Sequence, residues 1–211
     1  SSVPRRWWIL TIQSLRNMYR MHWISLSLPT DRWTVHGAHC GPEWDIRSLS
    51  IWIFCLVGNE QWETQYLDMK HRYERFAQAI HAKYPEIRLI GSAGPDITSE
   101  RYEKAWKYYH GAVKTQKNYV YAVDEHYYVE PDWFYAHTDF YDEYPRDVKV
   151  FAGEYAAHPG HTELMEQKNC LGGALAEAAF LTGVERNADV VVLASYAPLF
   201  ARLGFTQWRR I

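Results

Sequence analysis

Short apolar runs alternate with longer amphipathic stretches along most of the chain beyond residue 50. Runs of this length, bounded by Gly, Pro or charged residues, are typical of strands that are buried on both faces. The expected strands cover residues 51–57, 87–92, 119–123 and 148–152.

Between these runs, apolar residues recur at steps of three and four, which predicts helices. Residues 63–84 follow this spacing, and Pro85 ends the run. Further helices are expected over 98–109, from Pro131 onward, and over 171–182. An alternation of strand and helix with short connections is typical of a parallel α/β sheet or barrel.

The segment 189–200 fits two structures. Three consecutive valines favour a strand, whereas Asp189 as a helix cap and the length of the segment permit a helix. We expect the helix.

Two glutamates each follow an apolar run. Glu60 closes Gly58-Asn59-Glu60 after the first expected strand, and Glu154 lies in Gly153-Glu154-Tyr155 after the fourth. The carboxyl end of a parallel strand is where barrel and open-sheet enzymes place their chemistry. Two such carboxylates suggest the acid/base and nucleophile of a glycoside hydrolase. On spacing alone, two solvated loop glutamates are an equal alternative.

Composition narrows the range of functions. The formal net charge of −2 gives no electrostatic argument for binding nucleic acid or an anionic membrane. No stretch reaches the roughly 18 apolar residues of a transmembrane helix. Aromatic residues make up 16% of the chain, which is compatible with carbohydrate binding and equally with a large core.

The cysteines and the first residues add little. Cys40, Cys55 and Cys170 lack zinc or redox spacing, and their odd number argues against a complete disulfide framework. No metal and no cofactor are expected. The chain starts at Ser1 without a Met or the apolar region of a signal peptide, so we expect it to begin inside a longer protein. Its localisation stays open between secreted, periplasmic and cytoplasmic.

Several motifs follow one another in a fixed order between residues 57 and 208. They are Gly58-Asn59-Glu60-Gln61-Trp62, Asp124-Glu125-His126-Tyr127-Tyr128, Gly153-Glu154-Tyr155-Ala156, and the stretches 176–181 and 194–200. In this order they resemble the α-L-arabinofuranosidases of glycoside hydrolase family 51. An Asn-Glu pair alone would be a weak signal, but the ordered series is specific.

The resemblance implies a (β/α)₈ (TIM) barrel whose acid/base ends the fourth strand and whose nucleophile ends the seventh. By motif, Glu60 is then the acid/base and Glu154 the nucleophile. The chain is expected to run from about strand 4 to helix 7 of that barrel. Strands 1–3, strand 8 and the family's accessory β-domain are expected to be missing.

The resemblance also implies substrate-binding residues. Asn59 would hydrogen-bond the sugar 2-hydroxyl, while His126 and Tyr128 would lie beside the carboxylates. Trp62 would line a subsite, with loop or core packing as the alternative. Tyr127 is expected on the opposite face of its strand, because side chains alternate along a strand.

The family's chemistry is the retaining, exo-acting removal of α-L-arabinofuranosyl groups from arabinan, arabinoxylan or their oligosaccharides, which are the implied partners. A β-xylosidase or endoglucanase of the same clan, or an inactive gene-model fragment, remains an alternative. No nucleic-acid or membrane partner is expected, and a homo-oligomer of the full-length enzyme is left open.

Residues 1–55 show no steady period and hold six of the ten tryptophans. Family members carry Trp-Gly-Ala-x-Arg and Gly-His-Pro-Glu-Pro-Phe upstream of the Asn-Glu motif, and neither is present here. Read from the third base of each codon, residues 44–50 permit Met-Gly-His-Pro-Glu-Pro-Phe. We therefore predict that residues 1–55 are an out-of-frame or non-native segment and that 56–211 are the C-terminal half of the catalytic domain. The alternative is a divergent N-terminal region.

Four other titratable residues receive no catalytic role. His158 and His161 flank Gly160 in an expected loop and should be solvated. Glu177 and Glu185 fall on helical patterns and should be surface or structural residues.

Overall fold

The computed structural model describes residues 54–60, 69–159 and 170–197, together with the backbone of three short segments near the N-terminus. These segments are β1 (Trp7–Thr11), β2 (His22–Ser27) and β3 (Thr34–Gly37), which pair as an antiparallel sheet in the order β1-β2-β3. Three strands of this length do not decide whether residues 1–55 are out of frame, so that division of the chain stays a prediction.

A second sheet forms the body of the fold. Its five parallel strands follow the chain order, β4-β5-β6-β7-β8. The strands are β4 (Phe54–Val57), β5 (Arg88–Ser92), β6 (Ala122–Val129), β7 (Lys149–Ala157) and β8 (Val191–Ala194). This order, with a crossover between each pair of neighbours, is the arrangement from which α/β barrels are built.

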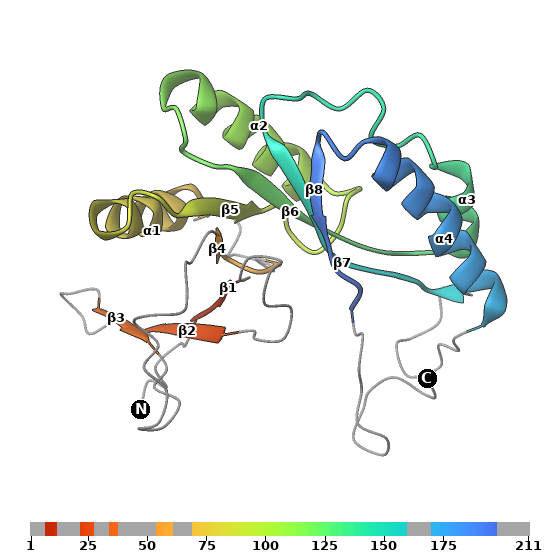
Figure 1. Ribbon diagram of the computed structural model, residues 1–211, viewed down its shortest axis with the longest axis horizontal. Coiled ribbons are helices and arrows are strands. Elements are labelled where there is room, and N and C mark those ends of the chain that lie inside the picture. Colours follow the sequence, from red (N-terminus) through yellow and green to blue (C-terminus); the bar gives the residue numbers. More distant parts are fainter. Residues whose placement is uncertain are drawn as a thin grey trace, which may run out of the picture.

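Four helices supply the crossovers. They are α1 (Met69–Lys83), α2 (Glu100–Thr115), α3 (Pro131–Ala136) and α4 (Leu171–Arg186). Figure 1 shows them following the strands along one side of the sheet, from α1 near β4 to α4 beside β7 and β8. The expected alternation of strand and helix is confirmed. None of the helices in the described ranges combines the length and apolarity needed to cross a bilayer.

The segment after Asp189 corrects two expectations. It forms the strand β8 instead of a helix, and this strand pairs with β7 through Val150↔Val191 and Phe151↔Leu193. Consecutive β-branched valines suit a pleated surface better than a helix, and the free edge of β7 offers them a hydrogen-bonding partner. Strand 8 of the barrel was expected to be missing, whereas the chain forms a further parallel strand after α4.

The two faces of the sheet have different cores. Leu56, Ile90, Ala122 and Phe151 pack together on one face of β4 to β7. Their neighbours along each strand pack against the helices on the other face, in a larger cluster that includes Tyr109, Tyr127, Phe134 and Phe180. Burying one such aromatic side chain contributes about 2–3 kcal/mol. The period of two along each strand therefore separates a helix-covered face from an inner face.

Two strands are longer than the sequence predicts. β6 continues through Asp124-Glu125-His126, and β7 continues through Glu154 to Ala157. The polar residues in these two stretches interrupt the apolar runs, so the runs alone predict strands that end too early. Glu154 therefore lies inside β7, and the prediction that it follows the end of the strand was wrong.

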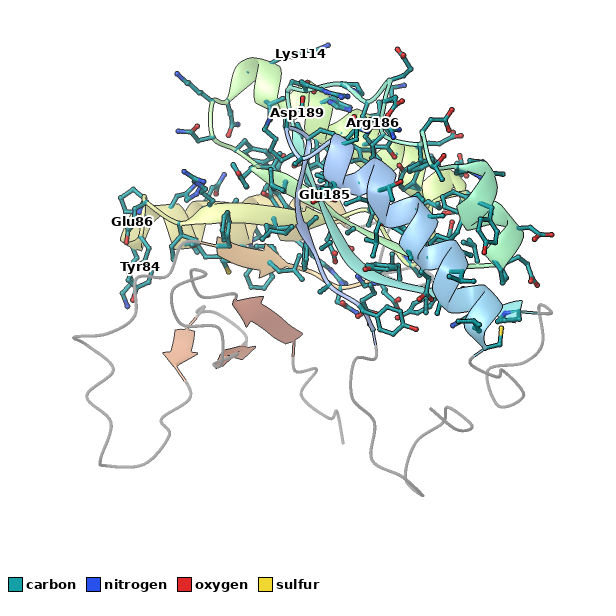
Figure 2. The ribbon with its side chains drawn as sticks, turned by 45° about the vertical axis from the view of Figure 1, so that its right-hand side comes forward. Tyr84, Glu86, Lys114, Glu185, Arg186 and Asp189 are labelled. Carbon is teal, nitrogen blue, oxygen red and sulfur yellow. The ribbon has the colours of Figure 1, made fainter. Side chains whose placement is uncertain are left out.

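Polar contacts hold together the end of the sheet at which the parallel strands begin. The Arg146 side chain donates hydrogen bonds to Asp189 Oδ2 (3.0 Å) and to Asn187 Oδ1 (2.9 Å). Asn187 in turn donates to Asp142 Oδ1 at 2.6 Å. Figure 2 shows Arg186 at the end of α4 and Asp189 next to β8, in this part of the molecule. The carboxyl ends of the strands, where α/β enzymes place their catalytic residues, lie at the opposite end of the sheet.

Candidate active site

The backbone turns sharply after β4 and presents Glu60. Gly58 has a φ of 104° and Glu60 a φ of 55°, both in the left-handed region. Glycine adopts that region freely, whereas a glutamate there costs roughly 1 kcal/mol or more. The side chain of Glu60 retains 20% exposure and is held by a contact with His126. Local strain of this kind is common where a side chain must point into a site.

Glu154 reaches the inner face through a bulge in β7. Phe151 packs on the inner face and Ala152 on the helix side, so strict alternation would turn Glu154 toward the helices. The pairing with β6 shifts at this point, because Glu125 opposes Ala152 and the next residue, His126, opposes Glu154. Gly153 is the extra residue. A bulge of this kind re-aims the side chain that follows it.

His126 lies between the two glutamates. Its Nδ1 is 2.9 Å from Glu60 Oε1 and 3.7 Å from Glu154 Oε2. Its Nε2 is 2.9 Å from Asp124 Oδ2. The imidazole ring is almost completely buried, so these carboxylates form its polar surroundings.

The charge state of His126 follows from this arrangement. Burial lowers the pKa of the imidazole, but Asp124, Glu60 and Glu154 outweigh that effect and raise the pKa to about 10. At neutral pH the ring is therefore an imidazolium, and both ring nitrogens donate hydrogen bonds. The site holds a positive charge between its carboxylates.

Tyr128 completes the contacts of Glu154. Its hydroxyl donates a hydrogen bond to Glu154 Oε2 at 2.7 Å. Burial and the neighbouring carboxylate raise the pKa of Tyr128, so the phenol keeps its proton and remains a donor. The ring of His158 stacks on Tyr128 with 4.8 Å between centroids. His158 is half-buried, and burial lowers its pKa, so the expectation of a solvated histidine was wrong there. His161 lies outside the described residues.

The two carboxylates lie close together. One oxygen of Glu60, one of Glu154 and a ring nitrogen of His126 all fall within 4.8 Å of one another. Carboxylates about 5–5.5 Å apart suit double displacement through a covalent intermediate, whereas a direct attack by water needs about 6.5–9.5 Å. The same three groups also have the donor types of a metal site. We interpret the cluster as a protonated His126 held between carboxylates and not as a metal site, because both ring nitrogens face carboxylates and the pKa of His126 is raised.

The structure thus brings together Glu60, Glu154, His126 and Tyr128. Asn59 is exposed beside Glu60. Trp62 lies outside the described residues, and its assignment to a subsite stays a prediction. Tyr127 packs on the helix side of β6, as the alternation along the strand predicts.

Sequence reasoning gave no role to two carboxylates of β6. Asp124 contacts His126 and is fully buried. Glu125 points to the helix side and accepts hydrogen bonds from Tyr102, Trp106, Tyr141 and Tyr144. On a strand, an Asp two residues before a His lies on the same face as the His. This spacing could therefore have predicted the contact between Asp124 and His126.

A parallel sheet covered by helices, with paired carboxylates at its inner face, is the architecture of a (β/α)₈-type glycoside hydrolase. Comparison with known proteins specifies the family. Residues 50–146 match the family model of the α-L-arabinofuranosidase 1 domain, and residues 153–207 match that of the α-L-arabinofuranosidase C-terminal domain. The chain belongs to the α-L-arabinofuranosidases of glycoside hydrolase family 51.

Two curated relatives illustrate the match. The extracellular exo-α-L-arabinofuranosidase of Streptomyces chartreusis is 44% identical over 155 residues, which are 72% of this chain and 17% of the relative. The α-L-arabinofuranosidase A of Aspergillus niger is 35% identical over 139 residues, which are 65% of this chain and 19% of the relative. The chain therefore spans less than a fifth of the length of these relatives in its matched part.

Solved structures agree on the fold. An arabinose-bound family 51 α-L-arabinofuranosidase superposes with a TM-score of 0.52 at 31% identity, over 74% of this chain and 23% of that one. A family 51 α-L-arabinofuranosidase from Bifidobacterium longum gives a TM-score of 0.54 at 14% identity, over 68% and 37% of the two chains. The second likeness concerns the fold alone.

Proposed function

We propose that this chain carries the catalytic centre of a retaining, exo-acting α-L-arabinofuranosidase. The substrates are terminal α-L-arabinofuranosyl groups of arabinan, arabinoxylan or their oligosaccharides. The observation that supports this function best is the approach of Glu60 and Glu154 to within 4.8 Å, with His126 between them. That spacing leaves too little room for a water molecule to attack from the side of Glu154.

In the first step, Glu154 attacks the anomeric carbon. A bond forms between a carboxylate oxygen and that carbon, the glycosidic carbon–oxygen bond breaks, and Glu60 gives its proton to the leaving oxygen. Tyr128 donates a hydrogen bond to Oε2 of this carboxylate, and Nδ1 of His126 faces the same oxygen. A nucleophile reacts only when it is correctly aimed, and these contacts fix the position of Oε2.

In the second step, Glu60 takes a proton from water while the water oxygen attacks the anomeric carbon and Glu154 departs. Nδ1 of His126 donates a hydrogen bond to Oε1 of Glu60. The proton that Glu60 transfers is therefore carried on Oε2, because a carboxylic acid that accepts at one oxygen holds its proton on the other. Asn59 precedes the acid/base and binds the sugar 2-hydroxyl in this proposal.

The activity is tested with a panel of nitrophenyl glycosides. Two proteins are assayed: the 211-residue chain, and a chimera in which the aligned segment of the Streptomyces chartreusis relative is replaced by that of this chain. Release of nitrophenol from the α-L-arabinofuranoside, well above release from β-xyloside and β-glucoside, is the expected result. Preference for a β-glycoside would contradict the proposal. Activity of the chimera without activity of the chain would show that the site needs further strands.

A further inference from the structure

The side chain of Asp124 is placed at high energetic cost. It is fully buried on β6, and Oδ2 accepts a hydrogen bond from His126 Nε2 at 2.9 Å. Its other oxygen, Oδ1, is buried and has no hydrogen-bond partner within the described part of the chain. A buried polar atom without a partner costs about 1–3 kcal/mol. Apolar residues often replace buried ion pairs without loss of stability, so stability alone explains this carboxylate poorly.

The neighbouring strand is shaped around this carboxylate. A Cβ atom at Gly153 would lie 1.8 Å from Asp124 Oδ1 and 2.9 Å from its Cγ. Any other residue at this position would therefore displace the carboxylate. Gly153 is also the extra residue of the bulge that turns Glu154 to the inner face. One glycine thus admits Asp124 and aims the glutamate that follows it.

The ring of His126 is surrounded by acids from three elements. Asp124 contacts Nε2 from β6, Glu60 contacts Nδ1 from the turn after β4, and Glu154 faces Nδ1 from β7. Asp124 is the most deeply buried of the three, whereas the side chains of Glu60 and Glu154 retain 20% and 34% exposure. Of these three acids, only Asp124 is closed to solvent. A buried carboxylate cannot reach a bound sugar, so we expect Asp124 to act through its hydrogen bond with His126.

We propose that Asp124 is a positioning residue that keeps His126 charged and aims its Nδ1–H between Glu60 and Glu154. The contact at Nε2 fixes the plane of the ring, and the negative charge of Asp124 stabilises the imidazolium. Its consequence for catalysis rests on the proposed function, in which the fixed positive charge of His126 faces Oε2 of the attacking carboxylate of Glu154 and helps to hold it in place. Its effect on His126 does not depend on that function.

The test is an NMR titration of the 211-residue chain with ¹⁵N-labelled histidine. In the unchanged protein, the ring nitrogens of His126 should keep imidazolium shifts up to about pH 9, because the pKa of this ring is raised to about 10. In Asp124→Asn, the amide oxygen can still accept from Nε2, but the charge is gone. The His126 proton affinity should fall at least 10-fold, and the imidazolium signals should disappear at correspondingly lower pH.

Asp147→Asn is the matched control. Asp147 lies 2.9 Å from His110 Nδ1 at the surface, so this variant removes a second Asp–His contact. It should leave the His126 titration unchanged. An unchanged His126 titration in Asp124→Asn would overturn the proposal. A shifted titration in Asp124→Asn, together with absence of arabinofuranosidase activity in the chimera that keeps Asp124, would support the role of Asp124 and count only against the proposed function.

A double-mutant cycle tests the packing of Asp124 against Gly153 without any need to observe the His126 signals. Gly153→Ala should destabilise the protein strongly when Asp124 is present, and much less in the Asp124→Ala background, where the colliding atoms are absent. The difference is read from denaturant unfolding. Equal effects of Gly153→Ala in both backgrounds would show that the space beside Gly153 is unrelated to Asp124 and would overturn the proposal.

Discussion

Tyr128 and Glu154 lie on neighbouring parallel strands and are joined by a hydrogen bond of 2.7 Å from the phenol to Oε2. In the strand register, Glu154 pairs with His126, the residue on the same face two positions earlier than Tyr128. A single shift in the pairing of β6 and β7 therefore sets both contacts. If Gly153 were paired regularly and formed no bulge, Tyr128 and His126 would still face the inner side, but Glu154 would face the helices.

Replacing Glu154 by Ala in the chimera should reduce the kcat for nitrophenyl α-L-arabinofuranoside by about 10³-fold or more, because no covalent intermediate can form. Azide should occupy the vacated space and restore part of the cleavage, giving an arabinosyl azide of inverted configuration. Product configuration is measured by ¹H NMR. A product of retained configuration would contradict the role of Glu154 as nucleophile.

Glu60→Ala should behave differently. Nitrophenolate is a good leaving group and needs little protonation, so formation of the intermediate should survive better than its hydrolysis. Azide should then attack the intermediate and give the azide of retained configuration. Pre-steady-state kinetics should show a burst of nitrophenol. If azide gave the same anomer in Glu60→Ala and Glu154→Ala, the assignment of the two roles would be wrong.

Tyr128→Phe removes one donor from Glu154 and leaves the ring in place. A hydrogen bond to a charged group contributes about 1.5–3 kcal/mol, so kcat should fall roughly 10- to 100-fold. Tyr135→Phe, at a position that is 46% exposed, is the control and should leave kcat unchanged. An unchanged kcat in Tyr128→Phe would show that this contact does not hold Glu154 for its attack.

Much of the helix-covered layer could be predicted from the sequence. The apolar runs locate β5, and the three- and four-residue steps locate the starts of α2 and α4, because the side chains that face the core are apolar. Both helices continue beyond their expected ends, α2 as far as Thr115. The carboxyl halves of β6 and β7 could not be found in this way. There the inner face carries Asp124, His126 and Glu154, so the strands continue where the apolar pattern stops.

The motifs indicated four residues that the structure brings together, namely Glu60, Glu154, His126 and Tyr128. Their roles stay predictions, and the motifs carry no information on the shift in strand pairing at Gly153. The role of that glycine depends on the position of Asp124 on another strand. Similarly, the valines before Ala194 became a strand because the edge of β7 was available, which is a tertiary effect.

Glu125 should make the stability of the chain depend on pH. Burial raises the pKa of its carboxyl from 4.5 to about 7, although the hydrogen bonds from Tyr102, Tyr141, Trp106 and Tyr144 oppose that rise. The folded protein therefore binds this proton more tightly than the unfolded chain. The corresponding stability is complete below pH 4.5 and is lost as the pH rises through 7. A pKa rise of this size corresponds to roughly 3 kcal/mol.

Glu125→Gln should remove most of the decline of the unfolding free energy between pH 4.5 and 7, because its side chain does not ionise. Burial also raises the pKa of Glu177, so a smaller decline should remain. Urea unfolding at several pH values measures this slope. Glu103→Gln, an exposed change on α2, should retain the slope of the unchanged protein. His126 also has a raised pKa, but its contribution is lost at higher pH, as the pH rises from 6.5 through about 10. A Glu125→Gln protein that kept the full decline below pH 7 would show that another group carries it.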